Sequence, residues 1–278
     1  MIQDIGEHTF DNQYHPCPPD RESYALYYED HAALVRKYPD RIEFPKFRDI
    51  ERLNEDIYED AVYLFSIDGE RYYLVEEINR ERQSHFTMEN TEIFRYTEPQ
   101  YLAFAGITGY QLHNWYQSRR FCGKCGRRMK KDSKERMLYC ESCHNMEFPK
   151  ICPAVIIGVT DGDKILMSKY AGRTYKKYAL LAGFTEIGET LEETVQREVM
   201  EEVGLKVKNI RYYKSQPWSF TDTLLMGFYC DLDGGAAITL DREELAMAEW
   251  FQRDEIPVEP ERDSITNEMI IRFKNGKV

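Results

Sequence analysis

The sequence lacks a long hydrophobic run, which excludes a membrane-spanning helix. Its longest nearly apolar stretch, Ile151 to Val159, is far shorter than the roughly 20 residues that such a helix needs. The first residues contain neither a basic nor an apolar segment, so no secretion signal is expected. Basic residues are also scarce, 37 against 49 acidic ones, and the net charge of −12 argues against non-specific binding to nucleic acid or anionic lipid. We therefore expect a cytoplasmic protein.

The chain is nevertheless long and apolar enough to form more than one folded domain. It has 278 residues, of which 42% are hydrophobic, and a domain commonly takes about 100–200 residues. From Ala154 onward, strand-like and helical patterns alternate, which favours an α/β fold. We place an N-terminal α+β domain in residues 1–120, a small metal-binding module in 121–150 and an α/β domain in 151–278.

Four of the seven cysteines form two Cys-x-x-Cys pairs, Cys122 with Cys125 and Cys140 with Cys143, separated by fourteen residues. Without a secretion signal, such pairs indicate a zinc site rather than disulfides. The two-residue spacer lets both thiolates of one turn face an ion at about 2.3 Å, and the second pair completes a tetrahedron. Because all four ligands come from the protein, the single zinc ion per chain should be structural. A redox role would need a thioredoxin-like βαβ unit, which the pattern does not indicate.

Residues 1–120 contain one clear hairpin pattern and one helical segment. Strand-like runs at 60–67 and 71–75 flank Asp68-Gly69, a pair typical of a tight turn. The pattern recurs around Asp161-Gly162, so the N-terminal region could be a degenerate copy of the C-terminal one. Hairpins are common, however, and an unrelated origin is equally compatible with the sequence. Residues 101–120 are predicted to form a helix that leads into the metal-binding module.

A basic cluster lies on this module, with nine basic and two acidic residues between positions 119 and 136 and a local net charge of +7. Zinc modules with such a charge can bind nucleic acid. A solvated face that offsets an acidic protein is the interpretation we favour, and nucleic-acid binding stays open. The basic residues are Arg119, Arg120, Lys124, Arg127, Arg128, Lys130, Lys131, Lys134 and Arg136.

Residues 183–205 are predicted to form a tight loop followed by a helix. Gly183 and Gly188 permit a loop whose backbone comes close to a ligand. Thr190 and Glu193 form a Thr-x-x-Glu capping box, which predicts the start of a helix. Gly204 is placed to end that helix in the left-handed conformation.

Two glutamates of this helix are expected to face inward. At roughly 100° per residue, Leu191, Val195 and Val199 form an apolar stripe that must face the core. Glu198 and Glu202 fall on or beside that stripe. Two inward carboxylates one turn apart repel each other and lose hydration. A cation between them would relieve both penalties, and carboxylate oxygens favour Mg²⁺ or Mn²⁺.

The segment resembles the Nudix box, Gly-x5-Glu-x7-Arg-Glu-U-x-Glu-Glu-x-Gly-U with U an aliphatic residue, at every defined position. The resemblance implies an α/β/α sandwich with a mixed sheet, and metal-dependent hydrolysis of a nucleoside diphosphate linked to another group. It implies that Glu198 and Glu202 are the principal metal ligands, with Glu201 beside them and the carbonyl of Ala182 as a further ligand. The box residues with structural roles would be Gly183, Gly204 and the ion pair of Glu189 with Arg197.

A zinc ribbon before a Nudix domain, itself preceded by about 120 residues, resembles the NADH pyrophosphatase branch of the family. That branch has a second motif, Ser-Gln-Pro-Trp-Pro-Phe-Pro-x-Ser, which aligns with residues 215–223. Here Ser219 and Thr221 replace prolines and Thr223 replaces a serine, so the loop is less rigid. The resemblance implies substrate contacts from Gln216, Pro217, Trp218, Ser219, Phe220, Thr221, Asp222 and Thr223, with the rings of Trp218 and Phe220 available to stack on a nucleobase.

Four more positions follow from the same resemblance. Glu244, which precedes a leucine, would be a further metal ligand, and Glu135 in the zinc ribbon would contact substrate. Phe148 occupies a place often taken by a substrate-contacting tyrosine, and so lacks the hydroxyl. Thr266 stands in a segment that resembles Ser-Ile-Ala and departs from it near the substrate.

The predicted reaction is hydrolysis of NAD(H) to nicotinamide mononucleotide and AMP, with two or three Mg²⁺ or Mn²⁺ ions per site. Glu201 or Glu202 would accept the proton of the attacking water. Related enzymes also remove NAD caps from RNA 5′ ends, which makes NAD-capped RNA a second candidate substrate, and the family implies a homodimer. The alternative is a Nudix-fold regulator that senses nucleotides and binds nucleic acid without hydrolysis. Such proteins usually lack box glutamates, all of which are present here.

Overall fold

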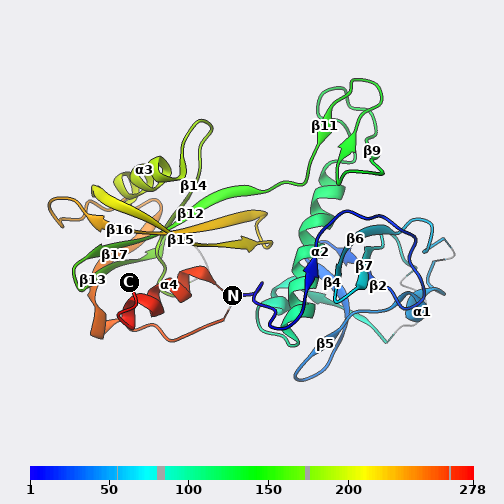
Figure 1. The fold of residues 1–278 in the computed structure, drawn as a ribbon, viewed down its shortest axis with the longest axis horizontal. Coiled ribbons are helices and arrows are strands. Elements are labelled where there is room, and N and C mark those ends of the chain that lie inside the picture. The colour runs from blue at the N-terminus through cyan, green and yellow to red at the C-terminus, as the bar shows by residue number, and fades with distance from the viewer. Residues whose placement is uncertain (55, 80–84, 173–175, 263) are drawn as a thin grey trace. The chain divides into compact units, whose positions relative to one another are not determined.

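The computed structural model describes residues 1–54, 56–79, 85–172, 176–262 and 264–278, which form two compact units (Figure 1). The C-terminal unit comprises Met1, Ile151–Trp218 and Asp222–Val278. The N-terminal unit comprises Ile2–Lys150 and Ser219–Thr221, so the four cysteines belong to the same unit as the residues before them. None of the helices in these ranges is long and apolar enough to span a bilayer.

The C-terminal unit is built on a mixed sheet of six strands, in the order β15-β16-β12-β13-β17, with β14 paired to β12. Strands β12 and β16 are parallel, and the other pairs are antiparallel. Helices α3 and α4 lie on opposite sides of this sheet (Figure 1). The elements are β12 (Cys152–Asp161), β13 (Lys164–Tyr170), β14 (Leu181–Phe184), α3 (Leu191–Val203), β15 (Val207–Trp218), β16 (Thr223–Leu232), β17 (Leu245–Gln252), the 3₁₀ helix η2 (Arg253–Glu255) and α4 (Ile265–Lys274).

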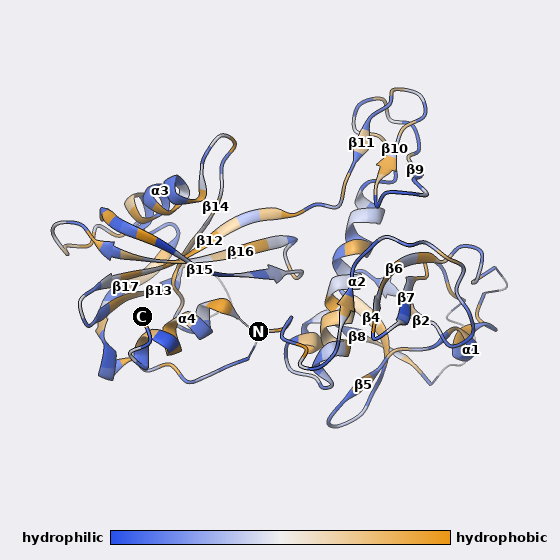
Figure 2. Ribbon diagram, in the orientation of Figure 1, coloured by the Kyte–Doolittle hydropathy of each residue, from blue (hydrophilic) through white to orange (hydrophobic). Residues whose placement is uncertain are grey.

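The central strand β12 shows why two helices cover this sheet. It is apolar on both faces (Figure 2), and successive side chains point to opposite sides. Val155 and Ile157 pack in one cluster with Val199 of α3. Ile156 packs in the other cluster, with Met269 of α4. The predicted α/β/α sandwich with a mixed sheet is therefore confirmed.

The N-terminal unit holds two four-stranded sheets, ordered β1-β6-β7-β2 and β3-β4-β5, the latter with β8 paired to β4. The predicted hairpin is present as β6–β7, with Asp68 and Gly69 at positive φ of 53° and 80°. The predicted helix is α2. The elements are β1 (Phe10–Asp11), β2 (Tyr24–Leu26), β3 (Tyr28–Glu29), β4 (Ala32–Lys37), β5 (Ile42–Glu43), α1 (Phe47–Ile50), β6 (Val62–Ile67), β7 (Glu70–Leu74), β8 (Thr87–Asn90), η1 (Thr91–Arg95) and α2 (Gln100–Ser118).

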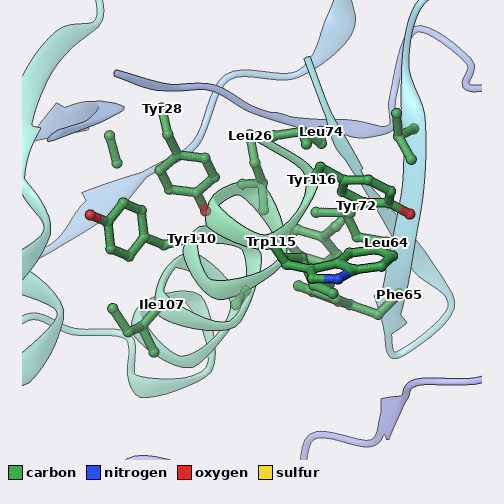
Figure 3. Packing of buried hydrophobic residues seen from close by; sticks show 14 of the residues in the cluster. Leu26, Tyr28, Leu64, Phe65, Tyr72, Leu74, Ile107, Tyr110, Trp115 and Tyr116 are labelled. Atoms are coloured by element: carbon green, nitrogen blue, oxygen red, sulfur yellow. The ribbon is translucent and has the colours of Figure 1, made fainter. Parts of the chain in front are cut away.

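The zinc module shares its core with the rest of this unit. It contains a three-stranded antiparallel sheet of β9 (Lys130–Lys131), β10 (Leu138–Tyr139) and β11 (Met146–Glu147). Aromatic side chains of α2, including Trp115 and Tyr116, pack against Tyr72 and Phe65 of the sheet (Figure 3). Cys122 and Leu138 belong to that same buried cluster. The zinc module therefore packs on α2 as part of one continuous core.

Candidate active site and zinc centre

Helix α3 begins and ends where the sequence predicts. The Oγ1 of Thr190 accepts a hydrogen bond from the Glu193 amide at 3.2 Å, and Glu193 Oε2 accepts one from the Thr190 amide at 2.8 Å. Gly204 adopts the left-handed conformation with φ of 69°, and its amide donates to the Met200 carbonyl at 3.0 Å. Local capping signals thus fix which residues of the helix face the sheet.

The inward carboxylates of α3 lie where the helical wheel predicts. Glu198 and Glu202 are only 9% and 2% exposed, whereas Glu192, Glu193 and Glu201 are exposed. Burial raises the pKa of Glu198, because the charged form loses hydration. The positive charge of Arg197 acts in the opposite direction, and the carboxylates of Glu201 and Glu244 raise this pKa further. The helix therefore holds a carboxylate in surroundings that favour added positive charge.

Glu198 lies directly against the backbone of β14. A Cβ placed on Gly183 would overlap the carboxylate carbon and both oxygens of Glu198. Gly183 pairs with Val155 in the sheet, and its neighbour Ala182 pairs with Ile156. Only glycine therefore lets α3 bring this carboxylate onto the strand at position 183.

Arg197 joins the loop and the helix through several glutamates. Its Nε and Nη2 donate to the Glu189 carboxylate at 2.6 and 3.0 Å, and its Nη2 also donates to the Phe184 carbonyl. Its Nη1 donates to Glu198 Oε1 at 2.7 Å and to Glu201 Oε2 at 2.9 Å. The guanidinium lowers the pKa of Glu189 to about 2. The sequence predicts the pair with Glu189; the contacts with Glu198 and Glu201 are additional.

The segment that carries Glu244 is attached to the end of α3. The Thr239 amide donates to the Val203 carbonyl and the Asp241 amide to the Glu202 carbonyl, both at 2.9 Å. Asp241 Oδ1 then accepts from the Glu243 amide at 2.8 Å and shapes the turn. The turn leaves the Glu244 side chain exposed, and its charge acts on Glu198.

These carboxylates fit a hard divalent cation by their chemistry. Their donors are carboxylate oxygens, the ligands that Mg²⁺ and Mn²⁺ prefer, and the buried Glu198 favours a nearby positive charge. Within the described ranges, Glu198, Glu202 and Glu244 do not form a group whose ligand atoms all lie within 4.8 Å of one another. The side chains are therefore near one another but not gathered into a closed cage.

The four cysteines do form such a group, with all sulfur atoms within 4.8 Å of one another. Cys122 Sγ lies 3.5 Å from Cys143 Sγ, and Cys125 Sγ lies 3.4 Å from Cys140 Sγ; none of these residues is in a disulfide. The two Cys-x-x-Cys turns have the same geometry. The backbone amide of Gly126 donates to the Cys122 carbonyl, and that of His144 donates to the Cys140 carbonyl. Both donor residues have a positive φ. Backbone amides of Cys143 and Ser142 help lower the pKa of Cys140 to about 6. This geometry supports a structural zinc ion.

The Gln216 side chain lies inside the C-terminal unit. It is fully buried, and its Oε1 accepts a hydrogen bond at 2.7 Å from the amide of Ile265, the first residue of α4. The sequence predicts a substrate contact for Gln216 and gives no sign of this contact, which joins residues 49 positions apart. Trp218 ends β15 and is half-buried.

The other predicted substrate residues are divided between the two units. Thr223 is buried in β16, and Thr266 is half-buried in the first turn of α4. Glu135 and Phe148 are exposed on the zinc module of the N-terminal unit. Of the motif 215–223, the C-terminal unit holds the exposed Pro217 and the half-buried Asp222, and the N-terminal unit holds Ser219, Phe220 and Thr221.

Comparisons with known proteins match two parts of the chain to families. Residues 150–273 match the NUDIX domain, and residues 117–148 match the NADH pyrophosphatase zinc ribbon domain. Proteins called NAD-capped RNA hydrolase NudC from Photorhabdus laumondii and Enterobacter sp. are each 41% identical over 162 residues. That alignment covers 58% of this chain and 63% and 62% of the relatives, less than two thirds of their length. A crystal structure of a NUDIX hydrolase from Nitrosomonas europaea is similar with a TM-score of 0.49 and 24% identity, covering 57% of this chain and 92% of that one.

Proposed function

We propose that this chain, whose residues 150–273 match the NUDIX domain, hydrolyses the diphosphate of NAD(H) to nicotinamide mononucleotide and AMP. The observation that carries the proposal is the buried pair Glu198 and Glu202 on one face of α3, with Glu198 against Gly183. The match of residues 117–148 to an NADH pyrophosphatase zinc ribbon supports a dinucleotide substrate. The names of the relatives support the same substrate class.

In this proposal, Glu198, Glu202 and Glu244 hold two or three Mg²⁺ or Mn²⁺ ions, with the Ala182 carbonyl as a further ligand. When bound, such ions neutralise the charge of the diphosphate and lower the pKa of water. The contribution of the chain is to keep the carboxylates in place. Arg197 donates to Glu198 and Glu201 at once, which restricts the rotation of both side chains.

Proton transfer and substrate orientation are assigned to two different groups of residues. Glu201 or Glu202 accepts the proton of the attacking water: Arg197 holds the Glu201 carboxylate, and Glu202 is buried on the face of α3 that carries Glu198. Trp218 and Phe220 offer aromatic faces for the nucleobase, and such stacking contributes about 1–3 kcal/mol per base. The proposal includes a homodimer, as the family resemblance implies.

The experiment is product analysis with NADH, NAD⁺ and ADP-ribose in Mg²⁺ and in Mn²⁺, on the wild type and on Glu202→Gln. We expect the wild type to release AMP and a mononucleotide from NADH. The variant should lose about 100-fold or more in kcat, because it loses a carboxylate from the reacting centre. Its zinc content and circular dichroism should stay unchanged. Glu192→Gln is the matched control, since Glu192 is exposed on the same helix, and it should keep full turnover.

Two results would contradict the proposal. One is a wild type that leaves every dinucleotide intact in both metals. The other is a Glu202→Gln variant with normal turnover, which would remove the buried carboxylate from the chemistry.

NAD-capped RNA is a second candidate substrate, favoured by the basic cluster on the zinc module. Within this cluster Arg119, Lys130 and Lys131 pair with acids, and Arg136 is half-buried. The side chains of the other five form no ion pair among the described residues, which leaves their charges available to phosphates. They are Arg120, Lys124, Arg127, Arg128 and Lys134.

The two substrates respond differently to salt. Turnover of an NAD-capped oligonucleotide should fall more steeply between low and high salt than turnover of NADH, because each phosphate contact releases counterions. Equal salt dependence of the two substrates would argue against a role of the cluster in RNA binding.

A further inference from the structure

Arg136 connects the zinc module to a segment more than a hundred residues earlier in the chain. It lies in the loop between β9 and β10, directly after Glu135. Its Nη2 donates to both the backbone carbonyl and the side-chain oxygen of Asn12, each at 3.1 Å. Its guanidinium carbon lies 5.3 Å from the ring centre of Tyr14. Both partners belong to the same compact unit as the zinc module.

The surroundings of this guanidinium are costly for a charge. Burial lowers its pKa, and the titratable groups that act on it are the hydroxyls of tyrosines 14, 63 and 116 rather than carboxylates. Its Nη1 is buried without a hydrogen-bond acceptor in the described part of the chain. An apolar side chain of similar size would avoid this desolvation penalty. Stability alone therefore does not explain an arginine here, whereas a planar group with fixed donors can set the direction of a loop.

The loop is attached at its other end as well. The Tyr14 hydroxyl donates to the Asp132 carbonyl at 3.2 Å. Asp132 Oδ1 accepts from the amides of Lys134 and Glu135, both at 2.8 Å. Residues 133–135 therefore lie between two contacts to the segment 12–14. The orientation of Glu135 follows from how this loop is held.

We propose that Arg136 is a positioning residue that fixes the Glu135 loop of the zinc module against residues 12–14 and so sets the orientation of Glu135, the residue that the proposed function assigns to substrate. This rests on the proposed function, because the contact of Glu135 with substrate is part of it. It also gives residues 2–118 a role, since they form the platform that orients the zinc module.

The test compares Arg136→Met, Arg136→Lys and Tyr14→Phe with the wild type, using NADH. Arg136→Met should keep zinc and raise the KM about tenfold, with kcat within about twofold. Arg136→Lys should not restore the KM, since an ammonium is a compact point charge on a flexible stem and lacks the planar group that lies near the Tyr14 ring. Tyr14→Phe keeps the ring but loses the bond to Asp132, and should raise the KM to a smaller extent. The matched control is Arg41→Met, which removes an exposed guanidinium 4.3 Å from the Tyr38 ring.

A double-mutant comparison separates positioning from a merely structural role. If Arg136 acts through Glu135, Arg136→Met should change the KM less than twofold in a Glu135→Gln background. Amide exchange should also become faster at residues 132–136 in Arg136→Met and stay unchanged in α2. This second readout needs no catalytic activity.

Three results would overturn the inference. They are an unchanged KM in Arg136→Met, an equal loss in the wild-type and Glu135→Gln backgrounds, or unaltered exchange in the loop. A wild type without activity on NADH would refute the proposed function instead, and the exchange experiment would still decide whether Arg136 holds the loop.

Discussion

Arg197 binds two glutamates whose acidities change in opposite directions. The pKa of Glu189 falls to about 2, chiefly through the hydrogen bonds from Arg197, whereas burial raises the pKa of Glu198. The charged form of Glu189 therefore stabilises the folded state, whereas the charged form of Glu198 destabilises it. This division is consistent with the proposed function, in which Glu189 is structural and Glu198 binds a cation.

Replacing Glu189 should have an effect that depends on pH. An acid whose pKa is depressed stabilises the folded state above its unfolded value of 4.5, and this contribution is lost as the pH falls through about 2. Urea unfolding at several pH values should show Glu189→Gln less stable than the wild type at pH 7, with the difference shrinking as the pH falls from 4.5 toward 2. Glu192→Gln, without an ionic partner among the described residues, is the control. A gap that stays constant down to pH 3 would argue against the ion pair as its source.

At the scale of elements, Gln216 links strand β15 to helix α4. Its Oε1 accepts from the first amide of α4, one of the donors that a helix leaves without an internal partner. This bond attaches the first turn of α4, which carries Thr266, to β15. The substrate contact expected for Gln216 and this structural role involve the same side chain. Its amide oxygen accepts the hydrogen bond from Ile265 in the absence of any ligand.

Gln216→Met should test that structural role. The change keeps the volume but removes the acceptor for a buried amide, so the free energy of unfolding should fall by about 1–3 kcal/mol. Thermal and urea unfolding measure the change, with Gln196→Met on the exposed face of α3 as the control. Unchanged stability would show that another acceptor replaces Gln216.

The sequence predicts those elements whose signals are local. Helix α3 was predictable because its cap, its ending glycine and its apolar stripe lie within fifteen residues, and the positions of Glu198 and Glu202 followed from the same wheel. The contacts of Gln216 with Ile265 and of Arg136 with Asn12 join residues 49 and 124 positions apart. No local pattern encodes such pairs, because they form only when separate elements pack.

At the scale of the whole molecule, the cysteines of the zinc site and the carboxylates proposed to bind divalent cations belong to different units. The cysteines lie in the N-terminal unit, and the carboxylates of α3 lie in the C-terminal unit. Cys122 and Cys140 belong to the same buried cluster as Trp115 and Tyr116 of α2. These two ligands are therefore part of the core of residues 2–150 and not of the sandwich that carries the glutamates.

Removal of zinc should accordingly destabilise one unit and spare the other. A zinc-selective chelator, with Mg²⁺ held in excess, or the substitution Cys140→Ser should leave three or four thiolates that repel each other inside the core. The thermal transition of the N-terminal unit should fall, and amides of α2 and β10 should exchange faster. Amides of β12 and β16 should keep their protection, because their core contains no sulfur ligand of the zinc site. Equal loss of protection in both units would show that the sandwich depends on zinc, and no loss in either would show that the thiols pack well without the metal.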